Sequence, residues 1–226
     1  MKQNKVPPPA EMPVDRKAWL GQLNLSNFIN TYYQYRDLQH CERCQKVLVV
    51  GPGQGLDSLV LKWRGYEITT LDIDEFFNPD YIGSVHDLSM FEDEQFDAVI
   101  ASHVLEHLAE PYLDSALGEI ARVGRYALIY LPVHGRHIQI RFLPGVKGID
   151  LSIIVDIFDY FKKPDGITPR YMSGQHFWEI GMKGFRVKDM KRRMSQFFSI
   201  ISAYRNRDWL PSYNFVLKSK KHNNIV

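Results

Sequence analysis

KVLVVGPGQG, residues 46–55, is the stretch that decides how this chain folds. Four apolar residues in succession, at positions 47–50, are typical of a strand that is buried on both faces. Glycine then recurs at alternate positions, at Gly51, Gly53 and Gly55. Apolar residues follow with the i, i+3, i+4, i+7 spacing of a helix, at Leu56, Leu59, Val60 and Trp63. Strand, glycine turn and helix predict the first unit of a nucleotide-binding α/β sheet.

The glycine turn would let a bulky cofactor approach the backbone N–H groups at the start of the helix. A glycine triplet alone is a weak signal, because any tight strand-to-helix turn favours glycine. Support comes from a second predicted strand at residues 67–71, which ends at Asp72. An acidic residue there, roughly 20 residues after the turn, is placed to accept hydrogen bonds from ribose hydroxyls. The G-x-G-x-G spacing differs from the dinucleotide fingerprint and favours a nucleoside cofactor without a pyrophosphate.

Length and composition set limits on the protein class. With 226 residues, 45% hydrophobic and 24% charged, the chain has room for one domain, or one domain with an extension. A formal net charge of +2 is too small to indicate nucleic-acid binding by itself. No apolar run approaches the roughly 18 residues of a membrane helix, so we expect no membrane partner. The first residues, MKQNKVPPPAEMP, contain no apolar targeting segment.

The chain contains two cysteines, Cys41 and Cys44. Two cysteines build no disulfide framework, and we therefore expect a cytoplasmic protein. His40 lies next to them, but a structural zinc site needs four ligands and no second C-x-x-C occurs. The sequence predicts no metal site.

Two parts of the chain differ in character. Residues 1–45 are expected to form an N-terminal extension, with a proline-rich disordered lead and one or two covering helices. Residues 46–226 are expected to form the main domain. Further strands are predicted at residues 81–85, 96–101, 126–131, 199–204 and 213–217, and helices at 109–123 and 187–194.

Five segments, in this order and spacing, resemble the class I methyltransferases that use S-adenosylmethionine. They are KVLVVGPGQG, TLDID, HDLSMF, FDAVIASHVLEHL and ALIYLP. The likeness is strongest to the small-molecule branch with a VLEHL-type segment. It implies an α/β, Rossmann-like sheet of seven strands, mostly parallel with an antiparallel last strand, and helices on both faces. It also implies S-adenosyl-L-methionine as the cofactor.

The resemblance implies roles for particular residues. The glycine turn would lie against the methionine part of the cofactor, Asp72 would bind the ribose, and Asp87 with the Leu88 backbone would meet the adenine. The segment 101–104 would lie beside the sulfonium. The implied cofactor-binding set is Gly51, Gly53, Gly55, Asp72, Ile73, Asp87, Leu88 and His103. One departure concerns Val49, because the family often carries an acidic residue at this position.

A long insertion at residues 132–178 follows the fifth predicted strand, and we expect it to face the substrate. Its basic and aromatic residues suit an anionic or sugar-like substrate, or an acidic partner. We expect it to close over the acceptor, with His134 and Arg136 facing inward. Leu151, Ile154, Phe158 and Phe161 are interpreted as the apolar face of a covering helix.

The methyl group of a sulfonium is already activated, so the enzyme needs alignment and a place for a proton. Histidine is the natural general base near neutral pH. His103 follows the fourth strand and His134 the fifth, at the ends of strands where ligands bind in open α/β sheets. These two are the predicted catalytic residues. His107, one helical turn beyond His103, is equally well explained by a structural role.

Three classes of function remain open. The sequence favours a methyltransferase of a small molecule, with a carbohydrate or an anionic metabolite as the acceptor. A methyltransferase of protein or nucleic acid is the alternative, supported only by the basic cluster at residues 186–193. A non-catalytic module that binds the cofactor is the third class, and Val49 keeps it open.

Overall fold

The computed structural model describes residues 23–142, 151–157, 164–169 and 174–221. A seven-stranded sheet forms its centre, in the order β3-β2-β1-β4-β5-β9-β8. The strands are β1 (Lys46–Val50), β2 (Glu67–Asp72), β3 (Tyr81–Ile82), β4 (Phe96–Ser102), β5 (Gly124–Pro132), β8 (Phe198–Arg205) and β9 (Ser212–Ser219). The first five pair in parallel, whereas β9 runs antiparallel to both β5 and β8. The predicted fold class is confirmed.

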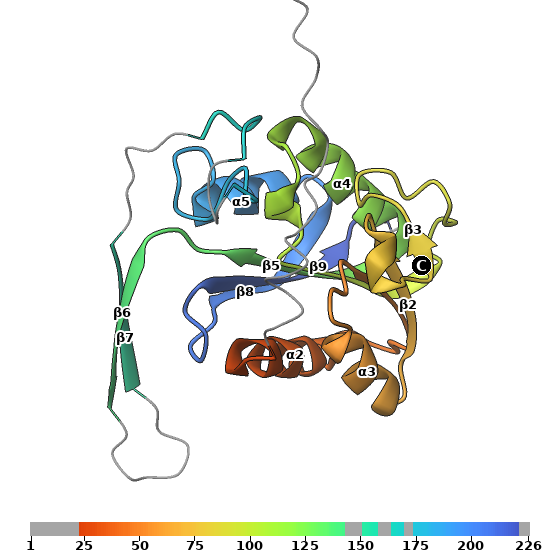
Figure 1. The fold of residues 1–226 in the computed structure, drawn as a ribbon, viewed down its shortest axis with the longest axis horizontal. Coiled ribbons are helices and arrows are strands. Elements are labelled where there is room, and N and C mark those ends of the chain that lie inside the picture. Colours follow the sequence, from red (N-terminus) through yellow and green to blue (C-terminus); the bar gives the residue numbers. More distant parts are fainter. Residues whose placement is uncertain (1–22, 143–150, 158–163, 170–173, 222–226) are drawn as a thin grey trace, which may run out of the picture.

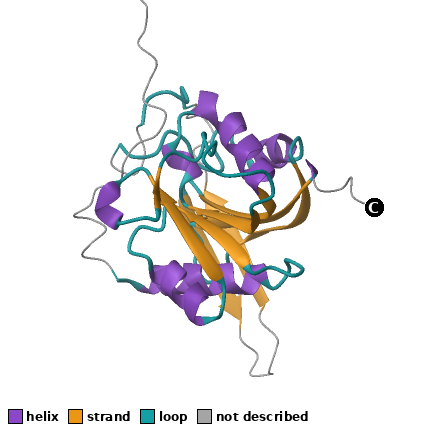
Figure 2. Ribbon diagram, turned by 90° about the vertical axis from the view of Figure 1, so that its right-hand side faces the viewer, coloured by secondary structure: helices purple, strands orange, loops and turns teal. Residues whose placement is uncertain are grey.

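Helices cover both faces of the sheet, as Figures 1 and 2 show. On one face lie α2 (Leu25–Leu38) and α3 (Leu56–Trp63), and on the other lie α4 (Glu110–Val123) and α5 (Val187–Met194). Two single-turn helices, η1 (Glu75–Phe77) and η2 (Leu105–His107), follow β2 and β4. None of the helices in the described part of the chain is long and apolar enough to cross a membrane.

Strand β1 contributes to two hydrophobic cores. Leu48 and Val50 belong to the core beneath α4, and Val47 and Val49 belong to the core beneath α2 and α3. Successive side chains of a strand point to opposite faces, so a strand between two helical layers must be apolar throughout. Val49 is only 1% exposed, and its side chain therefore serves packing.

Helix α2 is held against the sheet by a buried carboxylate. Asp37 is fully buried and accepts hydrogen bonds from the hydroxyl groups of Tyr130, at 2.7 Å, and Tyr204. Its other oxygen accepts from the Arg36 guanidinium at 2.7 Å. Because Tyr130 lies on β5 and Tyr204 on β8, one side chain joins the helix to two strands.

Three details of the predicted elements are wrong. The third strand is shorter than residues 81–85, since β3 ends at Ile82. Helix α3 is present, but it buries Ser58 and Leu61, whereas Leu59 is 67% and Trp63 is 79% exposed. Leu61 packs in the core with β1. This contact determines which face of α3 is buried, because the helix is too short for its apolar pattern alone to determine that face.

The third correction concerns the insertion. Part of the segment predicted as a covering helix lies instead in a hairpin. The hairpin consists of β6 (Arg136–Phe142) and β7 (Leu151–Ile157) and forms a separate two-stranded sheet. Leu151 and Ile154 belong to β7, and Phe158 and Phe161 lie outside the described residues. The run LSIIVDI is rich in β-branched residues, which favour strands. Figure 1 shows the hairpin standing off one side of the main sheet, and Arg136 is exposed rather than turned inward.

We predict that Asp37→Ala destabilises the protein by about 3–5 kcal/mol, because it leaves Arg36 and two tyrosine hydroxyls without their acceptor. Urea unfolding measures the change in free energy. Asp114→Ala is the control, since this carboxylate is 51% exposed and pairs with Arg193 at the surface. A loss at Asp37 no larger than at Asp114 would contradict the role given to this contact.

Candidate active site

The glycine turn joins β1 to α3 in a conformation that requires glycine. Gly51, Gly53 and Gly55 have φ angles of +63°, +50° and +74°. Residues with a side chain enter this left-handed region at a cost of roughly 1–2 kcal/mol. The N–H of Gly51 donates to the carbonyl of Leu71 at 2.8 Å, which ties the turn to the end of β2.

Asp72 ends β2 beside this turn. Its carboxylate accepts a hydrogen bond from the N–H of Asp74 at 2.9 Å. Burial raises the pKa of Asp72, and hydrogen bonds from backbone groups, including the N–H of Gly53, act in the opposite direction. Ile73 follows in a half-buried position. The structure therefore brings the predicted acidic residue and the central glycine of the turn together.

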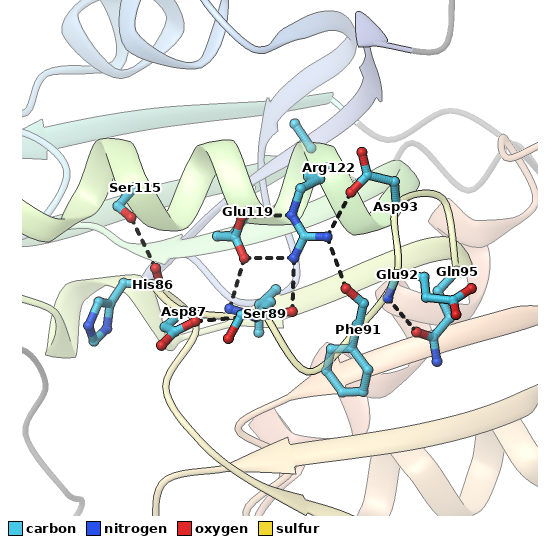
Figure 3. Close-up of polar contacts among 12 residues, drawn as sticks. His86, Asp87, Ser89, Phe91, Glu92, Asp93, Gln95, Ser115, Glu119 and Arg122 are labelled. Carbon is cyan, nitrogen blue, oxygen red and sulfur yellow. Dashed lines mark hydrogen bonds and ion pairs between the residues drawn. The ribbon is translucent and has the colours of Figure 1, made fainter.

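The predicted adenine side is a loop that α4 holds in place (Figure 3). Asp87 accepts a hydrogen bond from the N–H of Ser89 at 3.1 Å, and bonds from Ser89 lower the pKa of Asp87. Leu88 is fully buried. Its N–H donates to Glu119 and its carbonyl accepts from Arg122, each at 2.9 Å. Both polar groups of the Leu88 backbone are thus engaged with α4.

Arg122 is the centre of this arrangement and was missed by the sequence analysis. Its guanidinium makes two hydrogen bonds of 2.8 Å to Glu119, which raise the pKa of Arg122. It also donates to the carbonyl of Phe91 at 2.9 Å and to Asp93 at 2.8 Å. The one sequence signal was an acid and a base three residues apart on a predicted helix, which is common on surface helices.

His103 follows β4 in a strained conformation. Its φ of +56° lies in the left-handed region, which is uncommon for residues other than glycine. Its N–H donates to the carbonyl of Tyr130 at 2.9 Å, on the neighbouring strand. In the side chain, Nδ1 lies 3.5 Å from Oε1 of Glu106, and Nε2 lies 3.3 Å from the hydroxyl of Ser212. Such strain is found where the surroundings hold a functional residue in place.

His134 follows β5 and is also paired with a carboxylate. Its Nδ1 lies 2.8 Å from Oε2 of Glu179, and its backbone N–H donates to the carbonyl of Ile180 at 2.8 Å. The other oxygen of Glu179 lies 2.8 Å from Nδ1 of His176. Because β4 and β5 are adjacent and parallel, both predicted catalytic histidines lie at the same edge of the sheet.

Helix α2 reaches the same edge. Asn30 donates to the hydroxyl of Ser102, the last residue of β4, at 2.8 Å. Tyr33 donates to Asp208, in the loop between β8 and β9, at 2.7 Å. Helix α2 therefore connects the end of β4 with the β8–β9 loop.

Residues 48–126 match the family model described as a methyltransferase domain. This segment of the chain is therefore similar to methyltransferase domains. The match covers the glycine turn, Asp72, the adenine-side loop and the VLEHL segment, and with the sheet order it confirms the resemblance to methyltransferases that use S-adenosylmethionine. A search of curated proteins found no significant match to the chain.

Several solved structures share the fold of this chain. A protein from Pyrococcus horikoshii OT3 is 16% identical, with a TM-score of 0.55 over 89% of this chain and 94% of the other. The 1,6-didemethyltoxoflavin-N1-methyltransferase of Burkholderia thailandensis, solved with its substrate and S-adenosylhomocysteine, is 14% identical, with a TM-score of 0.52 over 94% and 93%. An S-adenosylmethionine-dependent methyltransferase from Archaeoglobus fulgidus is 17% identical, with a TM-score of 0.52 over 84% and 92%.

We predict that Gly51→Ala damages the turn more than Gly55→Ala does. A Cβ at position 51 would lie 2.6 Å from Cγ2 of Val104, whereas nothing lies within 4 Å of a Cβ at position 55. Both variants carry the penalty of a positive φ, so the difference between them isolates the contact with Val104. Urea unfolding and calorimetric titration with S-adenosylhomocysteine measure it. Equal effects of the two substitutions would show that Val104 moves away from the new Cβ without a loss of stability or of binding.

Arg122→Ala is predicted to cost about 2–4 kcal/mol in the free energy of unfolding, because several charged hydrogen bonds are lost at once. Arg192→Ala is the matched control. Arg192 also lies on a helix, but it is 76% exposed with one acidic contact at 3.6 Å, and such pairs contribute little. If both variants unfold at the same urea concentration as wild type, Arg122 does not hold the loop.

Proposed function

We propose that this protein transfers the methyl group of S-adenosyl-L-methionine to a small-molecule acceptor, with a carbohydrate or an anionic metabolite as the expected substrate. The observation that carries the proposal is the pairing of two histidines with carboxylates at the ends of adjacent strands, His103 with Glu106 and His134 with Glu179. Both pairs lie at the edge of the sheet where the glycine turn and Asp72 also lie.

The residues at this edge fit the cofactor. The glycine turn would place backbone without side chains against the methionine part, and the buried carboxylate of Asp72 would accept hydrogen bonds from the ribose hydroxyls. Ile73 and Asp87 would complete the site on the adenine side, whereas the Leu88 backbone, expected to meet the adenine, has its N–H and its carbonyl engaged by Glu119 and Arg122. Val49 cannot supply the carboxylate that relatives often have, since it lies in the core.

Bound S-adenosyl-L-methionine supplies an activated methyl group, so the residues of this chain have to orient the acceptor and take its proton. We assign His134 as the general base. The carboxylate of Glu179 faces Nδ1, which favours the tautomer with the proton on Nδ1 and makes Nε2 the basic nitrogen. The same carboxylate would stabilise the imidazolium after proton transfer. His103 is the second candidate, with a longer contact to Glu106.

Charge pairing on α5 favours a small acceptor over a nucleic acid. Arg193 contacts Glu110 at 3.4 Å and Asp114 at 3.0 Å, and Arg186 contacts Asp189 at 2.9 Å. Much of the basic cluster is therefore engaged with acidic groups. The free thiols of Cys41 and Cys44 support the expected cytoplasmic location.

The cofactor is tested by calorimetry with S-adenosylhomocysteine. Asp72→Ala should weaken binding by roughly 1–3 kcal/mol, because the ribose hydroxyls lose a charged acceptor. Glu67→Ala, which removes an exposed carboxylate at the opposite end of the same strand, should bind as wild type does. Undetectable binding to wild type, or tight binding of NAD, would refute the assignment.

His134→Ala should slow methyl transfer by roughly 10²–10⁴-fold and leave cofactor affinity nearly unchanged, as expected of a general base. The acceptor is first sought by incubating the protein and labelled cofactor with sugars and anionic metabolites. His40→Ala is the control, because His40 is exposed beyond the end of α2. Wild-type turnover in the His134→Ala variant would remove this residue from the mechanism.

A further inference from the structure

Beneath the strand ends lies a buried cluster whose two imidazoles have no part in the proposed methyl transfer. Glu106 and His107, both in η2, and His176 are 0%, 6% and 6% exposed. One potential ligand atom from each lies within 4.8 Å of the others, and no other group of this kind occurs among the described residues. The backbones also meet, because the N–H of Phe177 donates to the carbonyl of Glu106 at 2.9 Å.

In both imidazoles of this cluster, a hydrogen-bond partner at Nδ1 fixes the orientation of the ring. Nδ1 of His107 lies 3.1 Å from the carbonyl oxygen of Gln175, and Nδ1 of His176 lies 2.8 Å from Glu179. A histidine that binds a metal ion characteristically donates its other ring N–H to a carbonyl or a carboxylate. The two contacts therefore hold each ring in the tautomer that reserves Nε2 for a ligand.

Glu106 supplies the second, independent observation. Its side chain is fully buried, and neither carboxylate oxygen has a hydrogen-bond partner among the described residues. Its polar neighbours include Nδ1 of His103 at 3.5 Å and Nε2 of His176 at 3.9 Å. A buried carboxylate without hydrogen bonds is strongly unfavourable unless a positive charge lies next to it.

We propose that Glu106, His107 and His176 bind a divalent metal ion of the zinc type. Two imidazoles and one carboxylate are a known ligand set for zinc, whereas magnesium and calcium prefer oxygen ligands. Ligands about 2.1 Å from a tetrahedral ion are roughly 3.4 Å apart. The 3.9 Å between His176 and Glu106 closes to that separation with a small side-chain adjustment.

The ion would join η2, which follows β4, to the segment that carries His176 and Glu179. Sites with three protein ligands keep a position for water or a substrate atom. His103, 15% exposed, lies 3.5 Å from one of the proposed ligands, Glu106. The inference revises the sequence expectation of no metal, and it does not rest on methyl transfer or on the cofactor.

The competing explanation is that His176 is protonated and itself neutralises Glu106. Burial lowers the pKa of His176, but the carboxylates of Glu179 and Glu106 raise it by more. The pKa of His176 therefore lies above the usual value for histidine. Under this explanation the cluster takes up no metal.

The test uses the full-length protein, stripped of metal with a chelator and desalted. Titration with zinc chloride is followed by calorimetry, and titration with cobalt chloride by visible absorption. We expect one ion per chain and a cobalt spectrum without the sulfur charge-transfer band that ligation by Cys41 or Cys44 would produce. Unfolding temperatures with and without zinc should differ, with the zinc-loaded protein more stable.

Glu106→Gln, His107→Gln and His176→Gln should each weaken zinc binding by more than roughly 100-fold, since even the outer partners of a site are worth roughly 10–100-fold. His40→Gln is the control, because it removes a histidine next to the two cysteines. Circular dichroism and cooperative urea unfolding check that each variant is folded. The proposal fails if wild type takes up no zinc, if the three variants keep it, or if the cobalt spectrum shows sulfur ligation. The zinc and cobalt titrations of the wild-type protein test the proposal even if a variant does not fold.

Discussion

The structure depends on the burial of β1 between two helical layers. A strand in this position cannot tolerate a polar side chain on either face, and all four residues from Val47 to Val50 lie in one of the two cores. The strand must then stop where the layers open, and the left-handed glycines make the chain turn there. Each neighbouring parallel strand ends at the same edge, so the position of β1 determines where polar side chains can collect.

Those side chains form a continuous electrostatic arrangement. Glu179 contacts His134 with one oxygen and His176 with the other, and Glu106 contacts both His176 and His103. The two strand-end histidines are thus connected through two carboxylates and a third imidazole. Imidazoles and carboxylates alternate along this chain, so each of its histidines lies beside an acidic side chain.

The sequence predicted the parts of this fold that depend on local patterns. Continuous apolar runs located the parallel strands, and glycine spacing located the turn. What it did not predict depends on contacts between distant segments: the buried face of α3 is set by Leu61 against β1, and the loop at Leu88 is set by Arg122 from α4. His103 and His134 could be proposed as catalytic residues because strand ends are readable in sequence. The pairing of Glu179 with His134 and His176 could not be predicted, since nothing local in the sequence marks it.

The left-handed backbone of His103 has a consequence for engineering this protein. A side chain in that conformation costs roughly 1–2 kcal/mol, and glycine would avoid most of it. The same substitution would remove the imidazole that lies 3.5 Å from the buried carboxylate of Glu106 and packs against Trp209. At this position the backbone and the side chain therefore place opposite demands on the residue, and the usual stabilising exchange to glycine would gain little.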